Sequence, residues 1–190
     1  MGFADAEKFH PQSLEEWRDW LAANYDRDQG VWLVSWRGTT DRPTLGYQDI
    51  ICEALCYGWI DGQAKQLDDD RTMLWFIKRR PGSAWAASNK RRVQQLISQG
   101  RMRPSGQAMI DRAKSDGSWS VLDAAESLIE PTELSAALDA SPEARRYWDG
   151  LAPSLRKMAL GWVAMGKRPQ TRAKRISLIV ERVSRGERPY

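Results

Sequence analysis

Two extended segments joined by three consecutive acidic residues predict a β-hairpin in the first half of the chain. Residues 59–67 (WIDGQAKQL) and 71–78 (RTMLWFIK) have the composition of strands, and the aspartates at 68–70 have the chemistry of a tight turn. Residues 31–36 (VWLVSW) are rich in β-branched and aromatic side chains, with Trp32, Val34 and Trp36 on one side, which predicts a further strand. We therefore expect a small antiparallel sheet.

Helical patterns precede and interrupt these strands. Ser13 followed by Glu16 forms a capping box, and the apolar spacing after it predicts a first helix that ends near Asn24. Apolar side chains at helical spacing predict a second helix over residues 47–57, which Gly58 terminates.

A third helix is expected after the break at residues 81–83 (PGS). Ser83 is its predicted N-cap, and the helix is expected over residues 84–98. At 100° per residue around the helix axis, four side chains fall within about 60° of one another: Trp85, Asn89, Arg92 and Leu96. Polar and apolar side chains are therefore expected to share one face. A buried amide must be satisfied, and we expect Asn89 to bond to backbone, to Arg92 or to a ligand.

The remainder of the chain shows only helical patterns, from a short helix near residues 105–115 to two amphipathic stretches after residue 155. We predict an α+β fold, in which a small antiparallel sheet packed with helices is followed by an all-helical C-terminal third. The domains are expected at residues 1–125 and 126–190, with the helical module packed on the first domain.

The composition of the chain limits the classes of protein to which it can belong. Of 190 residues, 42% are apolar and 28% are charged, which is enough for a core and for solubility. No apolar run approaches the roughly 18 residues of a membrane span, and residues 1–10 (MGFADAEKFH) lack the basic and apolar regions of an export signal. We therefore expect a cytoplasmic protein without membrane association. With one histidine, His10, and two cysteines, Cys52 and Cys56, we expect reduced thiols and no metal site.

Positive charge is concentrated in two segments, although the net charge is only +4. Residues 78–103 contain eight basic side chains and no acidic one, and residues 166–190 contain eight basic and two acidic side chains. This segregation predicts either an anionic partner or an internal contact between acidic and basic layers. In the second segment the basic residues spread around an ordinary amphipathic helix, so nucleic-acid binding has weak support.

Six short motifs are spread over nearly the whole chain. The densest are EALCYGWIDG (residues 53–62) and RRPGSAW (residues 79–85), and the others are GVWLVSWRG, GRMRPSGQ, AKSDGSW and TRAKRI. Together they resemble the YdeI/OmpD-associated, or bacteriocin-protection, family. The resemblance implies a stress or bacteriocin-protection role without an agreed reaction, and a helical module over residues 131–186. Some descriptions of that family imply a periplasmic location, whereas this sequence shows no export signal, so we carry over the fold expectation alone.

The GWID motif supplies candidate site residues where a helix is expected to stop and a strand to start. Period-two alternation puts Trp59 and Asp61 on the same side of the strand, where we expect them to line a cleft. Glu53 lies about one and a half turns before the helix end, which makes an acid and base pair with Asp61 conceivable. In a structural alternative, Asp61 accepts backbone hydrogen bonds or pairs with Arg79 or Arg80.

The RRPGS motif has the physical elements of an anion-binding position. Arg79 supplies a guanidinium group, and the helix start expected at Ser83 supplies free N–H groups. Trp85 is placed to stack on a ligand ring, and Asn89 follows one turn later. The alternatives are a solvated loop, or one that clasps a nearby carboxylate, and a core position for Trp85.

The sequence favours a non-enzymatic stress-tolerance protein that binds an anionic small molecule or peptide in a cleft. The predicted ligand-binding residues are Glu53, Trp59, Asp61, Arg79, Ser83, Trp85 and Asn89. We predict no catalytic residue and no cofactor, because phosphate-binding, dinucleotide and nucleophile-elbow motifs are absent. Two alternatives stay open: an enzyme for an anionic substrate with Glu53 and Asp61 as acid and base, and a nucleic-acid or partner-protein binder that uses both basic segments.

Overall fold

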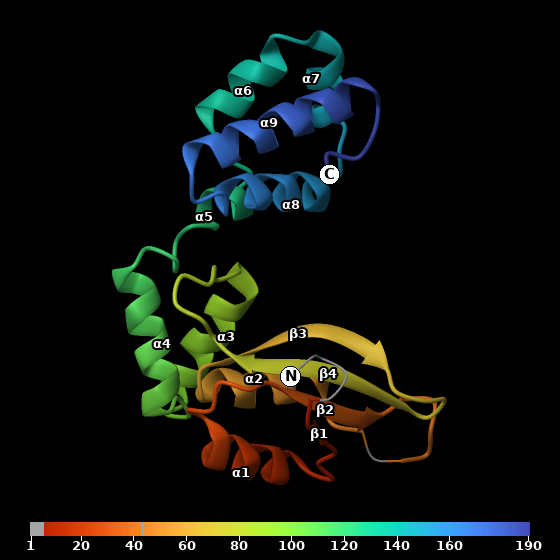
Figure 1. Cartoon of the computed structure of the whole chain (residues 1–190), viewed down its shortest axis with the longest axis vertical. Helices are drawn as coiled ribbons and strands as arrows, with labels where there is room; N and C mark the ends of the chain where they lie inside the picture. Colours follow the sequence, from red (N-terminus) through yellow and green to blue (C-terminus); the bar gives the residue numbers. More distant parts are fainter. Residues whose placement is uncertain (1–5, 43) are drawn as a thin grey trace. The chain divides into compact units, whose positions relative to one another are not determined.

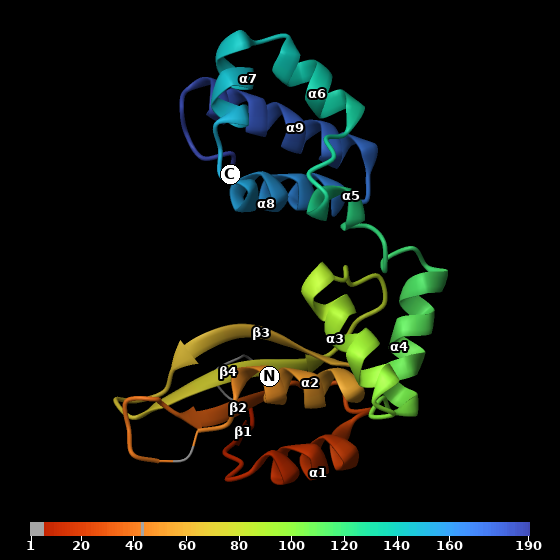
Figure 2. The same ribbon diagram turned by 180° about the vertical axis from the view of Figure 1, so that it is seen from behind.

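The computed structural model describes residues 6–42 and 44–190, and the chain forms two compact units (Figures 1 and 2). The first unit extends to Ser83 and also includes Ser88–Asp116. The second consists of Ala84–Ala87 and Gly117–Tyr190. The predicted division into domains at residues 1–125 and 126–190, and the packing of one domain on the other, stay predictions.

Within the described residues of the first unit, a four-stranded sheet forms the centre, in the order β1-β2-β4-β3. The strands are β1 (Lys8–Phe9), β2 (Val31–Trp36), β3 (Trp59–Gln66) and β4 (Arg71–Lys78). β1 runs parallel to β2, and the other pairs are antiparallel. The predicted strand and hairpin are therefore confirmed. The β3–β4 turn is held by Asp68, whose Oδ1 accepts hydrogen bonds from the N–H groups of Asp70 and Arg71.

Four helices accompany this sheet: α1 (Leu14–Asn24), α2 (Tyr47–Cys56), α3 (Ala87–Ser98) and α4 (Pro104–Ser115), counted over the residues that the structure describes. α1 begins as predicted, because the Ser13 hydroxyl accepts a hydrogen bond from the N–H of Glu16 at 3.1 Å. α1 packs against the sheet through Trp17, whose ring centroid lies 5.1 Å from that of Phe76 in β4. The same helix also packs against α2.

The predicted start of the third helix is wrong: α3 begins at Ala87, and Ser83 is not its N-cap. The N–H of Ser83 instead donates to the carbonyl of Arg80 at 3.1 Å and closes a turn over Pro81 and Gly82. The residues between this turn and α3 are not helical. Trp85 lies among them and packs on Trp119, with 5.0 Å between ring centroids. Its burial in the second unit outweighs the local preference for helix.

The corner between α2 and β3 is built on close contact with α4. A Cβ at Gly58 would lie 2.8 Å from Met109 Cγ, and the backbone of Gly58 has a φ of 84° that favours glycine. A Cβ at Gly106 would lie 2.2 Å from the carbonyl oxygen of Cys56. Glycine at both positions therefore allows α4 to reach the strand ends that line the candidate site.

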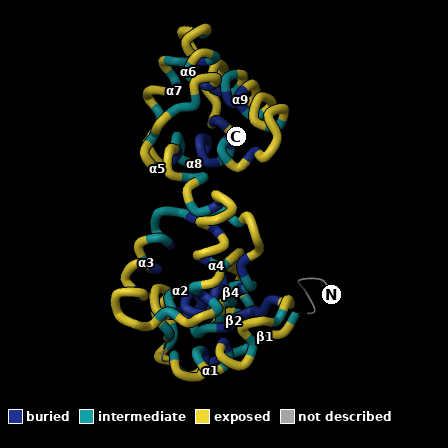
Figure 3. The backbone as a smooth tube through the Cα atoms, turned by 90° about the vertical axis from the view of Figure 1, so that its left-hand side faces the viewer, coloured by how far each residue is buried: buried dark blue, intermediate teal, exposed yellow. Residues whose placement is uncertain are grey.

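The second unit is helical in its described residues, which confirms the predicted all-helical C-terminal third. It contains α5 (Asp123–Glu126), α6 (Thr132–Asp139), α7 (Pro142–Asp149), α8 (Pro153–Ala164) and α9 (Pro169–Ser184). Buried side chains on the inner faces of these helices form its core, among them Leu134, Trp148 and Ile179. In Figure 3 the buried positions of the backbone are the dark blue segments of the tube. Over residues 6–42 and 44–190, none of the helices has the length and apolar character that a membrane crossing requires.

Candidate anion-binding site

Glu53 is a buried carboxylate held by two arginines. Its Oε1 accepts hydrogen bonds from Arg18 Nη2 at 2.8 Å and from Arg101 Nη2 at 2.6 Å, and its Oε2 accepts one from Arg18 Nε at 3.1 Å. Burial of Glu53 raises its pKa, but the hydrogen bonds and charges of the two arginines outweigh burial and keep the pKa below its ordinary value. Glu53 is therefore ionised at neutral pH and fixed by its partners.

Asp61 has a separate partner. The hydroxyl of Tyr47, the first residue of α2, donates to Asp61 Oδ2 at 3.1 Å. Burial of Tyr47 raises its pKa, and the charge of Asp61 and this hydrogen bond raise it further. Because Glu53 bonds to arginines and Asp61 bonds to a tyrosine, the acid and base alternative gains no geometric support.

Asn89, at the start of α3, has its side-chain oxygen satisfied within the first unit. Arg92 Nη1 donates to Asn89 Oδ1 at 2.7 Å, which is one of the three partners that the sequence allowed. Gln48 Oε1 accepts two further hydrogen bonds from the same guanidinium, at 2.9 and 2.8 Å. Arg92 therefore connects the start of α3 to the first turn of α2.

The two tryptophans expected to contact a ligand are core residues. Trp59 is fully buried, its Nε1 donates to the carbonyl of Tyr25 at 3.1 Å, and its ring meets the edge of Trp20. Trp85 is 2% exposed, belongs to the second unit and packs on Trp119. Their roles as ligand contacts stay predictions, and their visible role is packing.

A basic cleft of about 380 Å³ opens where β4 ends. It is lined by Asp28, Ile77, Lys78, Arg79, Arg80, Pro81, Met109 and Arg112. These residues come from the loop before β2, the end of β4, the turn after it and α4. Four lining side chains are basic and one is acidic, so the wall carries a surplus of positive charge.

Arg79 is the most buried charge of this wall, at 5% exposure. Burial lowers its pKa to about 10, and the charge of Asp61 acts in the opposite direction. Arg79 is therefore still a cation at neutral pH. Asp61 and Arg79 are thus two predicted site residues that the structure couples electrostatically.

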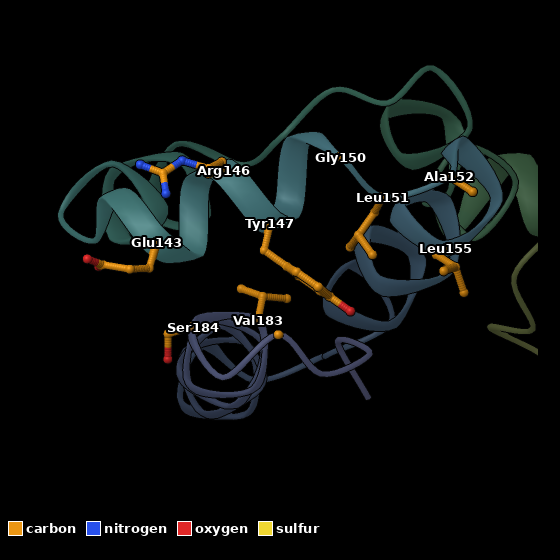
Figure 4. A pocket seen from close by; sticks show the side chains of 10 residues that line it. Glu143, Arg146, Tyr147, Gly150, Leu151, Ala152, Leu155, Val183 and Ser184 are labelled. Carbon is orange, nitrogen blue, oxygen red and sulfur yellow. The ribbon is translucent and has the colours of Figure 1, made fainter.

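A larger groove of about 680 Å³ lies in the second unit (Figure 4). In Figure 4 the side chain of Tyr147 on α7 lies beside Val183 on α9, with Leu151 next to it. The charged residues of the lining are Glu143 and Arg146, one of each sign. Its charge is therefore balanced, in contrast to that of the basic cleft.

Several residues around the predicted site lack a local sequence signal. Arg18 and Arg101 lie 35 and 48 residues from Glu53, and neither position is marked by a motif that would pair it with a carboxylate. Arg112 reaches the cleft from α4, and Asp28 reaches it from the loop before β2. The acid-free segment 78–103 indicated the region of the cleft, whereas these partners are distant in the sequence and come close only in the folded chain.

Fold and cleft together define a two-unit α+β protein whose first unit carries a basic, anion-compatible cleft and whose second unit is a helical module. The chain belongs to the family described as Domain of unknown function (DUF8412), whose model matches residues 9–109. Residues 127–186 match the family Bacteriocin-protection, YdeI or OmpD-Associated, which confirms the resemblance over the C-terminal part of the chain. No curated protein and no solved structure matches the chain.

Proposed function

We propose that the protein binds an anionic small molecule or peptide in the basic cleft, and that this binding, without a chemical reaction, serves a stress-tolerance or bacteriocin-protection role in the cytoplasm. The observation that supports the binding is the composition of the cleft wall, with Lys78, Arg79, Arg80 and Arg112 against Asp28. The family of residues 127–186 supports the protection role.

The cleft has the size and chemistry of an anion site. Its volume of about 380 Å³ lies within the range of small-ligand pockets. Guanidinium groups make charge-assisted, often bidentate hydrogen bonds to carboxylates and phosphates. Arg80 and Arg112 are exposed, so an incoming anion meets them first, while Arg79 lies deeper in the wall. Ile77 and Met109 contribute apolar surface to the lining, which suits the carbon skeleton of a ligand.

The anion site is tested by titrating the protein with citrate and following backbone amide shifts by NMR. We expect Arg112→Gln to weaken binding about tenfold, which corresponds to about 1.4 kcal/mol. Arg91→Gln is the matched control, because Arg91 is an exposed arginine of α3 outside the cleft lining. Equal citrate affinity in the two variants, or amide shifts confined to residues outside the cleft, would contradict the proposal.

A peptide ligand is distinguished from a small molecule in the same experiment. Hexaglutamate and citrate carry the same kind of anionic group, but the peptide extends beyond a cleft of about 380 Å³. Tighter binding of hexaglutamate, with shifts beyond the cleft, would identify a peptide ligand. Tighter binding of citrate, with shifts confined to the lining, would identify a small molecule.

A further inference from the structure

The turn that follows β4 presents a backbone N–H that the turn itself does not use. Pro81 and Gly82 occupy its two central positions, and the N–H of Ser83 closes it on the carbonyl of Arg80. Proline followed by a glycine with a φ of 72° is the signature of a type II turn. The closing hydrogen bond of such a turn leaves the N–H of its second central residue for an acceptor outside the turn.

A carboxylate of the protein accepts this hydrogen bond. Asp116 Oδ2 lies 3.1 Å from the backbone nitrogen of Gly82, in an exposed position. Asp116 is the C-cap of α4, and its N–H donates to the carbonyl of Arg112, one turn earlier on the helix. Pro81 and Arg112 both line the basic cleft, whereas Gly82 and Asp116 do not. Because the carboxylate is bound to the residue that follows Pro81, we place it beside the lining, at the rim of the cleft.

We propose that the N–H of Gly82 is an oxyanion subsite of the basic cleft, that Asp116 occupies this subsite in the free protein, and that a carboxylate of the ligand replaces it. This assignment rests on the proposed function of the cleft. The ligand class is a small polycarboxylate, with one carboxylate on Gly82 and the others on Arg80 and Arg112.

The exchange conserves the hydrogen bond of the Gly82 N–H, because the ligand carboxylate takes the position of the Asp116 carboxylate. While it stays in place, Asp116 adds a negative charge to the rim and weakens the binding of any anion. Asp116 therefore occupies the subsite in the free protein, and its charge also lowers the affinity of the cleft for anions.

Asp28 provides a matched control for this assignment. It is the acidic residue of the cleft lining, and Asp28→Ala removes the same charge as Asp116→Ala. The N–H of Gly82 donates to Asp116 and not to Asp28, so Asp116→Ala also removes the acceptor that occupies the subsite. A purely electrostatic role would give the two variants similar gains in affinity, whereas occupation of the subsite gives Asp116→Ala the larger gain.

The test uses the full chain, citrate as the probe and amide shifts as the readout. We expect Asp116→Ala to bind citrate about tenfold tighter and Asp28→Ala about two- to threefold tighter, and we expect citrate to shift the Gly82 amide of the unmodified protein. Equal gains in the two variants, or a Gly82 amide that citrate does not move, would overturn the assignment. Asp116→Ser is the second variant if Asp116→Ala fails to fold.

Two further outcomes separate the claims. If inorganic phosphate shifts the Gly82 amide at lower concentration than citrate, the carboxylate class is wrong. If the unmodified protein binds citrate and loses it in Arg112→Gln, but Asp116→Ala behaves like Asp28→Ala, the subsite fails and the proposed function stands. If neither the unmodified protein nor Asp116→Ala binds citrate, both are wrong.

Discussion

Arg101 Nη2 lies 2.6 Å from Glu53 Oε1, so a residue just beyond α3 holds a carboxylate in the middle of α2 across 48 positions of sequence. The Glu53 side chain is 3% exposed, while the side chains of Arg18 and Arg101 are each 40% exposed. Loss of the carboxylate leaves two arginines that water solvates, whereas loss of both arginines leaves a buried charge. The network is therefore more sensitive to loss of its cations than to loss of its anion.

Replacing both arginines is expected to destabilise the first unit more than replacing Glu53. We expect Glu53→Gln to lower the free energy of unfolding by about 1–2 kcal/mol, allowing for solvent screening of the arginines, and Arg18→Gln with Arg101→Gln by about 3 kcal/mol. Urea unfolding followed by first-unit amide resonances measures both. Glu181→Gln, which breaks an exposed pair with Arg185 in the second unit, is the control and should leave the unfolding of the first unit unchanged. The reverse order of the first two would contradict the asymmetry.

The stabilising effect of Glu53 is expected to disappear in acid. Its pKa in the folded protein lies below the ordinary value of 4.5, so the folded state holds its proton less tightly than the unfolded state. The contribution is therefore complete above about pH 4.5 and is lost as the pH falls through the folded pKa. The stability difference between the unmodified protein and Glu53→Gln should shrink between pH 5 and pH 3 in urea titrations, taken as roughly the window of this linkage. A difference that is constant over this window would show that charge is not its cause.

Trp59 is expected to affect stability without affecting the binding of citrate. Trp59→Phe leaves a void in the core and removes the hydrogen bond to the carbonyl of Tyr25, at a cost of about 2 kcal/mol. Arg112→Gln is the reciprocal control, with weaker binding and nearly unchanged stability, because Arg112 is exposed. Urea unfolding and the citrate titration, run on both variants, separate the two roles. A loss of citrate affinity in folded Trp59→Phe would contradict this expectation and show that Trp59 contributes to the ligand site.

The elements that could be predicted from the sequence are those with signals close together in the chain. The Ser13 cap and the turn at residues 68–70 act over three or four residues, and both form as expected. Asn89 and Arg92 are three residues apart on one helix, which made their hydrogen bond foreseeable. Strand β1 is two residues long, too short for any periodicity to mark it.

The features that escaped prediction depend on partners far away in the sequence. Ser83 has the chemistry of an N-cap, but the position of the helix start depends on Trp85, which packs on a ring 34 positions later. The hydrogen-bond partners of Glu53 are two arginines distant in the sequence, and no local pattern predicts that they lie close to it. Likewise, the RRPGS motif was predicted to offer the free N–H groups of a helix start at Ser83, whereas the N–H of Gly82 in this motif donates to Asp116, at the end of α4.

The second unit includes four residues, Ala84–Ala87, that come from within the sequence of the first. A gene fragment that starts at residue 117 would encode all five helices of the C-terminal module that follow, but it would omit Trp85, whose ring packs on Trp119. A fragment meant to contain the whole second unit therefore has to include residues 84–87 as well as residues 117–190.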